Sequence, residues 1–423
     1  ELLSDDSLID LSGQLILYFE PFSNYHKALG KFYVTSDSIL GREKMSLNDL
    51  SDDFPICNTL NYLNAASIGP VPQSVIDFST SFSAEIARGG TKTLSEEKED
   101  MVYDGLRDEG GKLFGCSPED VAVFNSVSEA LNCIAWSLEL DKGKLISTNI
   151  EFPSVTYPAL RMAQKEKGIT TKLVSAVDWH VPVEDILEEI DDTTKAVFIT
   201  HVENLTGQVH DIKRISERAH EVGAMVIVDG IQAAGYIPLD VKKLQIDAYI
   251  TGSYKWLCSP FGTGMAYVSK ELYDKLTPLF VGWRTAEEIW DFDPNVINYP
   301  STARKFEYST SAYGVKLGMV ESIKYLRNIG SDKIYEHDMK LDGILREELG
   351  QIEGVDIITI DEHGPIVTFK IEGRDSREIN NRLRNLERPV ELSVRLGLIR
   401  VSPHLYNTVE DIAQLIDGIR QVV

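Results

Sequence analysis

Between residues 120 and 270, short apolar runs alternate with longer amphipathic segments. The apolar runs predict strands at 120–125, 144–149, 171–177, 195–202, 224–230, 248–253 and 265–270. The segments between them predict helices at 128–140, 154–168, 183–191 and 212–223, with the second helix ending at Gly168. Strands separated by helices of this length are typical of βαβ units with a mainly parallel sheet. Runs such as MVIV fit strands that are buried on both faces.

The pattern changes on both sides of this region. Helices are predicted at 73–88 and 97–115 before it, and at 313–330, 331–350, 376–386 and 409–423 after it, with strands at 355–360, 365–371 and 399–402. Residues 1–56 mix apolar runs with acidic stretches and have no clean period. We therefore predict an N-terminal extension (1–56), a large α/β domain (57–310) and a smaller C-terminal α+β domain (311–423).

Composition excludes several classes of function. The 423 residues are 43% hydrophobic and 26% charged, as in ordinary globular proteins, and the net charge of −24 disfavours nucleic acid or an anionic membrane as a partner. No apolar run is long enough to cross a bilayer. The four cysteines, at wide and irregular spacing, form neither a disulfide framework nor a zinc pattern. We therefore expect no metal and a cytoplasmic location.

Chemically distinctive residues follow the predicted strands. In open parallel sheets, ligands bind beyond the carboxyl ends of the strands. The residues at those ends are Ser126, Val127 and Ser128, then Phe152, Asn204, Asp229 with Gln232, and finally Lys255. Each also has a plainer interpretation, because serine and aspartate commonly cap helices and a lysine after a strand is often a surface residue. Taken together, they predict a ligand site at one edge of the sheet.

The residue types at this edge indicate what the ligand is. Hydroxyls and free N–H groups at a helix N-terminus bind phosphate, and an aromatic side chain such as Phe152 can stack on a ring. A carboxylate at the end of a buried strand, as at Asp229, needs a cationic or hydrogen-bonding partner. The amine of Lys255 can condense with an aldehyde. The set suits pyridoxal 5′-phosphate as the cofactor.

Eight motifs, in order, carry a resemblance to a known family. They are YLNAASIGPVP, FNSVSEALN, EFPS, HVENLTGQVHDI, VDGIQAAGYIPLDV, GSYKW with PFGTG, KFEYST and IRVSPHLYNTVEDI, and they span residues 58–423. The chain resembles the class V aminotransferases of the fold-type I pyridoxal-phosphate enzymes. This group includes isopenicillin N epimerase-like proteins, cysteine desulfurases, selenocysteine lyases and kynureninases. The resemblance implies a large domain with a mainly parallel, seven-stranded type of sheet and a smaller C-terminal domain.

The resemblance also implies roles for individual residues. Lys255 corresponds to the Schiff-base lysine, and Asp229 to the partner of the pyridine nitrogen. The other cofactor-binding residues that it implies are Ser126, Val127 (through its N–H), Ser128, Phe152, Asn204, Gln232, Ser253, Tyr254 and Thr310. Thr310 would reach the phosphate of a neighbouring subunit, which predicts a homodimer with shared active sites. Arg400 would bind the carboxylate of an amino acid substrate.

The reaction itself is less closely specified by the sequence. We expect an aminotransferase or an isopenicillin N epimerase-like enzyme that acts on an α-amino acid. The alternative is a lyase of the kynureninase or selenocysteine lyase kind, which EFPS and SYKW favour, and a third possibility is a regulator that binds the cofactor without turnover. Phe152 stands where many relatives have histidine, so proton transfer would depend on Lys255. Because no cysteine follows Cys258, we do not expect a desulfurase that carries sulfur on its own cysteine.

Overall fold

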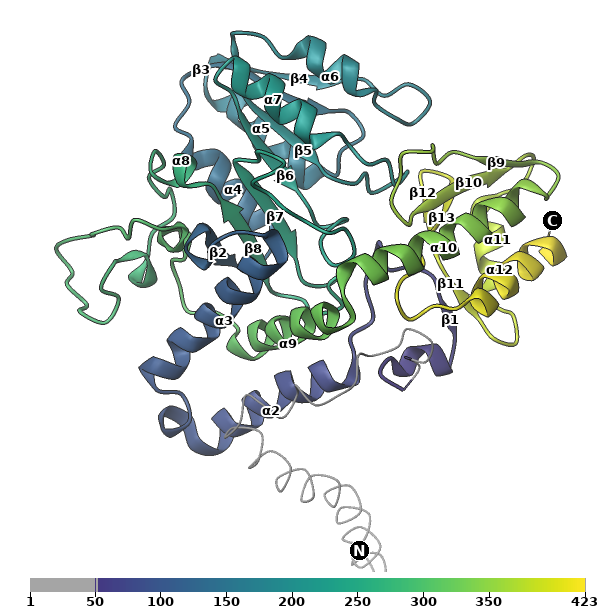
Figure 1. Ribbon diagram of the computed structural model, residues 1–423, viewed down its shortest axis with the longest axis horizontal. Coiled ribbons are helices and arrows are strands. Elements are labelled where there is room, and N and C mark those ends of the chain that lie inside the picture. Colours follow the sequence, from purple (N-terminus) through teal and green to yellow (C-terminus); the bar gives the residue numbers. More distant parts are fainter. Residues whose placement is uncertain (1–49, 51, 423) are drawn as a thin grey trace, which may run out of the picture. The chain divides into compact units, whose positions relative to one another are not determined.

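A seven-stranded sheet lies at the centre of the computed structural model, which describes residue 50 and residues 52–422 (Figure 1). The strand order is β2-β8-β7-β6-β5-β3-β4. The strands are β2 (Val121–Phe124), β3 (Lys142–Thr148), β4 (Gly168–Val174), β5 (Thr194–Thr200), β6 (Met225–Asp229), β7 (Ala248–Gly252) and β8 (Gly264–Val268). Neighbours from β7 to β4 are parallel, whereas β8 runs antiparallel to both β7 and β2. The predicted α/β fold with a mainly parallel sheet is confirmed.

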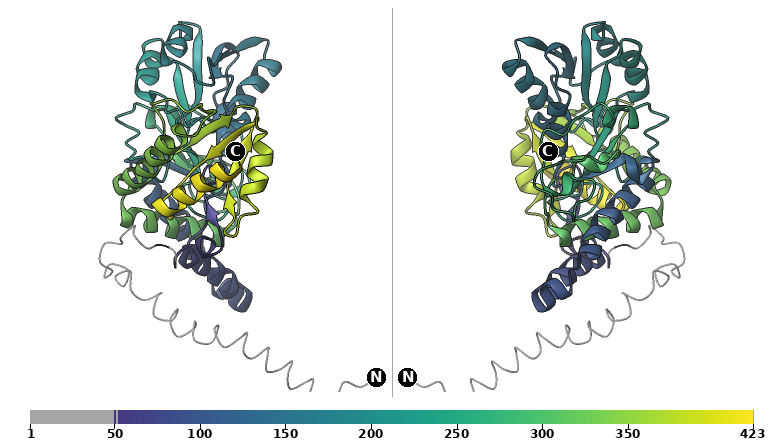
Figure 2. Two further views of the ribbon diagram at one scale, coloured as in Figure 1. Left: turned by 90° about the vertical axis from the view of Figure 1, so that its right-hand side faces the viewer. Right: turned by 90° about the vertical axis from the view of Figure 1, so that its left-hand side faces the viewer.

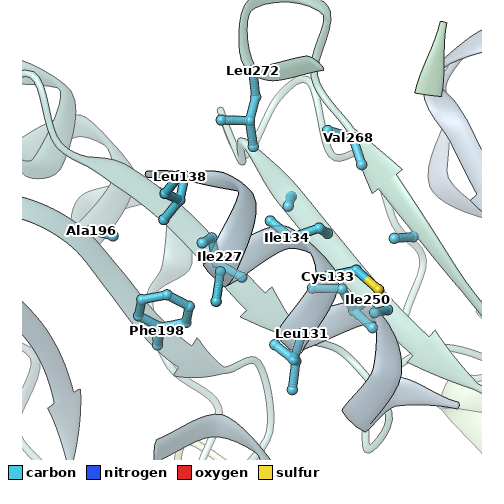
Figure 3. Close-up of a cluster of buried hydrophobic side chains, with 14 of the residues drawn as sticks. Leu131, Cys133, Ile134, Leu138, Ala196, Phe198, Ile227, Ile250, Val268 and Leu272 are labelled. Atoms are coloured by element: carbon cyan, nitrogen blue, oxygen red, sulfur yellow. The ribbon is translucent and has the colours of Figure 1, made fainter. Parts of the chain in front are cut away.

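Helices cover both faces of this sheet. On one face, α4 (Val127–Ser137) and α5 (Pro153–Lys165) share a hydrophobic core with alternate strand residues, and Figure 3 shows Leu131 and Ile134 beside Phe198 and Ile227. On the other face lie α3 (Glu96–Phe114) and α7 (Ile212–Glu221). Side chains alternate between the faces of a strand, so a sheet covered on both sides needs the continuous apolar runs that the sequence contains.

The C-terminal part has its own sheet and core. Four strands in the order β12-β13-β10-β9 pack with three helices around a separate apolar cluster. The elements are α10 (Ser331–Gly350), β9 (Val355–Ile357), β10 (Val367–Ile371), α11 (Ser376–Leu383), β12 (Ser393–Arg395), β13 (Leu398–Val401) and α12 (Val409–Val422). The helices α10 and α12 lie side by side in Figure 1 and in the left view of Figure 2. The expected smaller C-terminal domain is therefore present.

The remaining elements connect these two parts. β1 (Asn61–Tyr62) pairs in parallel with β11 (Val390–Glu391), which joins the start of the described chain to the small domain. The other helices are α2 (Gln73–Gly89), α6 (Val183–Glu189), α8 (Lys270–Tyr273) and α9 (Tyr313–Ile329), and the 3-10 turns are η1 (Pro55–Asn58), η2 (Gly90–Lys92), η3 (Pro118–Asp120), η4 (Trp283–Thr285) and η5 (Ala303–Phe306). In the described part of the chain, no helix is both long and apolar enough to cross a membrane. Most of the predicted N-terminal extension lies outside the described residues.

One pair of predicted elements was placed wrongly. The helix expected to end at Gly168 ends at Lys165 as α5, and Gly168 begins β4, which ends at Val174 rather than at residue 177. Parallel pairing with β3, from Lys142 opposite Gly168 onward, sets this register. A Cβ at Gly168 would lie 2.3 Å from the carbonyl oxygen of Asp141, so the glycine serves close strand approach and not helix termination.

Candidate active site

A cleft of about 540 Å³, partly open to solvent, lies at the carboxyl ends of the parallel strands. Its lining comes from the N-terminus of α4, the start of α5 and the segments that follow β5, β6 and β7. The lining residues are Ser126, Val127, Ser128, Phe152, Ser154, Thr200, Asn204, Asp229, Ile231, Gln232, Tyr254 and Lys255. Nine of the twelve residues predicted for the site therefore line one cleft, as the topology of a parallel sheet requires.

Hydroxyls gather at the first turn of α4. Ser126 is the N-cap, and its side chain accepts a hydrogen bond from the N–H of Glu129 at 3.1 Å. The hydroxyl of Ser128 lies 2.7 Å from that of Ser154, which belongs to α5. A Cβ at Gly264 would lie 2.8 Å from the carbonyl carbon of Ser126, so the antiparallel strand β8 can approach this turn only with glycine there. The helix N-terminus and these hydroxyls form a site suited to a phosphate group.

Two ionisable side chains of the cleft come from the ends of β6 and β7. Asp229 ends β6, is 3% exposed, and accepts a hydrogen bond at Oδ1 from the N–H of Ile231 at 2.9 Å. Lys255 follows β7, and its Nζ lies 5.9 Å from the centre of the Phe152 ring. Phe152 is 54% exposed, as expected for a ring with a face available to a ligand.

Two amide side chains complete the lining. Gln232 donates from Nε2 to the carbonyl of Ala66 at 3.1 Å and accepts at Oε1 from the indole of Trp256 at 2.7 Å. The Nδ2 of Asn204 lies 3.4 Å from Glu203, and its backbone carbonyl accepts a hydrogen bond from Arg400. Gln232 is thus oriented by two buried partners, which limits how it can turn toward a ligand.

Three predicted site residues do not line the cleft of this chain. Ser253 is buried and donates its hydroxyl to the carbonyl of Pro260 at 2.5 Å. Thr310 is exposed, and its hydroxyl accepts from the indole of Trp283 at 3.2 Å. Arg400 is 2% exposed and donates to the hydroxyls of Ser67 at 2.7 Å and Ser393 at 3.1 Å. Their roles toward cofactor, partner subunit and substrate stay predictions.

Burial perturbs the titration of the reactive groups. It raises the pKa of Asp229 to about 6, although the N–H of Ile231 and the charge of Lys255 oppose the shift. It lowers the pKa of Lys255 to about 8, against the attraction of Asp229. Burial also raises the pKa of Glu203 to about 8 and that of Glu151 well above its usual value, but neither residue lines the cleft. Asp229 and Lys255 do line it, and groups with perturbed pKa values in one cleft are typical of catalytic sites.

Three lining residues were missed from the sequence. Ser154 lies two residues beyond Phe152, Thr200 is the last residue of β5, and Ile231 follows Asp229 by two. The prediction covered helix caps and the residues after each strand, so a hydroxyl on the last strand residue escaped it. The predicted strand ran to residue 202, so Thr200, the last residue of the observed strand, was counted inside the strand and not at its end.

The cleft fits pyridoxal 5′-phosphate in the chemistry of its donors. Hydroxyls and N–H groups lie at a helix N-terminus, a buried carboxylate ends β6, and a lysine lies beside an exposed aromatic ring. These are the groups that would hold a phosphate, a ring nitrogen, an aldehyde and a ring face, respectively. Among the described residues, no group of three or more His, Cys, Asp or Glu side chains is placed to hold a metal ion.

The fold is that of an α/β protein with a cleft at the carboxyl edge of its parallel strands. The family model of the class-V aminotransferases matches residues 61–415, and the chain belongs to that family. The predicted family is thereby confirmed, and pyridoxal 5′-phosphate is confirmed as the cofactor of that family. The predicted residues that bind it in this chain stay predictions.

The relatives carry several names. A probable cysteine desulfurase of Methanothermobacter thermautotrophicus is 27% identical over 410 residues, which cover 89% of this chain and 98% of the relative. An uncharacterized aminotransferase of Bacillus subtilis, YcbU, is 29% identical over 371 residues, covering 86% of this chain and 95% of the relative. A cystine C–S lyase, solved with its product cysteine persulfide, shares the fold with a TM-score of 0.79 at 22% identity, covering 86% and 98%. A variant of that lyase was solved with glycine covalently linked to its pyridoxal-phosphate cofactor.

Lys255 is predicted to bind the cofactor covalently, and its pKa predicts that this uptake depends on pH. Only a neutral amine attacks an aldehyde. Because the pKa of Lys255 is about 8, the neutral fraction of its amine grows about tenfold per pH unit below pH 8 and levels off above it. We expect the rate at which the cofactor-free protein binds pyridoxal phosphate covalently to follow this curve between about pH 6.5 and 9.5, measured by stopped-flow absorbance. Free N-acetyl-lysine, with a pKa of about 10.4, is the reference. A protein rate that keeps rising in parallel with it would contradict the prediction.

Proposed function

We propose that this enzyme cleaves the Cβ–S bond of a sulfur-containing α-amino acid and releases the sulfur in a small molecule. The observation that carries the proposal is a cleft without cysteine, in a chain that is similar to proteins named for cysteine desulfuration and cystine C–S cleavage. A desulfurase that carries sulfur on its own chain needs a reactive cysteine near the substrate.

The cysteines of this chain are poorly suited to carry sulfur. None lines the cleft, and Cys133 and Cys258 are buried. Burial raises the pKa of Cys57, Cys116 and Cys133 to about 12, which keeps these thiols protonated and weakly nucleophilic at neutral pH. The prediction from sequence that a persulfide-carrying desulfurase is disfavoured therefore gains a physical basis.

The residues of the cleft would divide the work as follows. Lys255 would take the proton from Cα at its Nζ, and Asp229 would keep a proton on the ring nitrogen of the cofactor. When bound, pyridoxal phosphate supplies an electron sink for the charge that develops at Cα. Arg400 would bind the substrate carboxylate, which is a stronger acceptor than the Ser67 hydroxyl to which its guanidinium now donates.

With cystine as the substrate, the reaction needs water as its only other reagent. The Cβ–S bond breaks, and its electron pair leaves with the sulfur as cysteine persulfide. The remaining three-carbon fragment takes up water and yields pyruvate and ammonia. We expect the holoenzyme to form pyruvate and persulfide from cystine in equal amounts, measured by a coupled pyruvate assay and by alkylation of the persulfide followed by mass spectrometry.

The control variants are Cys57→Ala and Cys116→Ala, which remove the two partly exposed thiols. Sulfur release should persist in both, and its loss would assign a sulfur-carrying role to this chain and contradict the proposal. A panel of other amino acids tests the remaining reactions. Release of the matching keto acid would make the enzyme an aminotransferase, inversion at Cα would make it epimerase-like, and absence of turnover would indicate a regulator.

A further inference from the structure

The loop that carries Lys255 is held by contacts with residues that do not line the cleft. We name residues 253–259 the lysine loop. The carbonyl of Tyr254 accepts from the N–H of Gly69 at 2.8 Å, and the carbonyl of Lys255 accepts from the N–H of Cys258 at 2.9 Å. A Cβ at Gly69 would lie 2.0 Å from the carbonyl oxygen of Lys255, so only glycine permits this approach. Cys258 has a φ of +47°, a conformation that a non-glycine residue rarely adopts.

A buried ion pair reaches the same loop from the small domain. His404 lies 3.1 Å from the carbonyl of Trp256 through Nε2 and 2.7 Å from the carboxylate of Asp338 through Nδ1, and both side chains of the pair are fully buried. A carbonyl can only accept, so Nε2 carries a hydrogen and donates it. Burial opposes a charge on this ring, but the Asp338 carboxylate, together with Cys258, outweighs burial and raises the pKa of His404 to about 10.

Trp256 connects His404 to a residue of the cleft lining. Its ring packs edge-on against that of His404, with 5.0 Å between centroids, and its indole N–H donates to Gln232 at 2.7 Å. Gln232 in turn donates to the carbonyl of Ala66 and lines the cleft. The His404 ring therefore contacts the residue next to Lys255 in two ways. It donates to the carbonyl of Trp256, and it packs against the indole that donates to Gln232 in the cleft lining.

The same short segment also carries the predicted substrate arginine. Arg400 donates to the carbonyl of Asn204 and to Ser67, the hydroxyl of Ser402 accepts from the N–H of Ala66 at 3.0 Å, and His404 donates to the lysine loop. This segment therefore contacts both Asn204, which lines the cleft, and the lysine loop.

We propose that His404 and Asp338 are a positioning pair that holds the lysine loop through the Trp256 carbonyl and so sets the place of Lys255 relative to Arg400. The proposal rests on the proposed roles of Lys255 and Arg400. A pair that only stabilised the small domain would leave the mobility of the lysine loop unchanged when it is lost.

The test compares variants of the pair with a matched buried histidine. His404→Phe removes the donor and the charge but keeps a ring, and Asp338→Asn keeps the shape but removes the charge. The control is His210→Phe, because His210 is 3% exposed and neither ring nitrogen has a hydrogen-bond partner. Hydrogen exchange of the full-length, cofactor-free proteins is measured by mass spectrometry. We expect exchange of the amides at 253–259 to be at least about tenfold faster in both pair variants and unchanged in the control.

A second measurement separates this proposal from the proposed function. Each protein is loaded with pyridoxal phosphate, reduced with borohydride and mapped by peptide mass. If the label on the wild-type protein is not on Lys255, the proposed function fails, whatever the exchange shows. If the label is on Lys255 and exchange at 253–259 is unchanged in both pair variants, or rises equally throughout the chain, the positioning role alone is overturned. Should His404→Phe not fold, Asp338→Asn decides by the same criteria.

Discussion

Replacing Lys255 with alanine is expected to abolish covalent attachment of the cofactor and to lower kcat by at least about a thousandfold. The amine is both the group that would condense with the aldehyde and the base that would take the proton from Cα. A positioned acid or base contributes about 10²- to 10⁴-fold to a rate, and loss of covalent capture adds to that effect. Borohydride reduction followed by peptide mass mapping measures the attachment, and steady-state kinetics with cystine measure the rate.

Lys316→Ala is the matched control for this substitution. Lys316 is 1% exposed, and burial lowers the pKa of its amine to about 8, as it does for Lys255. It donates to the carbonyl of Phe124 at 2.9 Å and does not line the cleft. A label retained in Lys255→Ala and lost in Lys316→Ala would place the reactive lysine at 316 and disprove the assignment.

Replacing Asp229 with asparagine is expected to lower kcat by about 10²- to 10³-fold while the cofactor remains attached to Lys255. An amide keeps the shape, and its oxygen can still accept from the N–H of Ile231, but it cannot hold a positive charge on a ring nitrogen. Loss of one such preorganised electrostatic contact typically costs a factor of this size. Unchanged turnover would remove Asp229 from the mechanism.

The same variant should be more stable than the wild-type protein when the cofactor is absent. The pKa of Asp229 rises from the ordinary aspartate value of 3.8 to about 6 in the folded protein, so the ionised carboxylate costs folding free energy. This cost is absent below about pH 4 and grows between about pH 4 and pH 6. At higher pH it levels off at about 3 kcal/mol at most. Urea unfolding at about pH 4 and pH 8 should show a gain for Asp229→Asn only at the higher pH. A gain of equal size at both values would contradict the assignment to ionisation.

Much of the fold follows from periodicity. The helices α9 and α10 lie within one residue of the predicted 313–330 and 331–350, because each is a long amphipathic segment with a glycine at its end. The exception is instructive. At Gly168, a local rule for helix termination competed with a requirement of strand approach, and the pairing of β4 with β3 decided between them.

The candidate site divides in the same way. Asp229 and Lys255 were predicted because each follows a buried strand, and strand ends in a parallel sheet meet at one edge. Ser253 shows the limit of that reasoning, because the same position in a loop suits either a ligand or the loop's own hydrogen bonds. In the fold its hydroxyl donates to Pro260.

The α/β class, the family and the edge of the sheet where the candidate site lies could all be predicted from the amino-acid sequence, because they depend on local periodicity and on residues beside strand ends. Which distant residues support that site depends instead on the tertiary packing. His404 pairs with Asp338 across 66 positions, and Arg400 reaches the carbonyl of Asn204 across 196. Such contacts leave no periodic signal along the chain, because they arise where independently formed elements pack together.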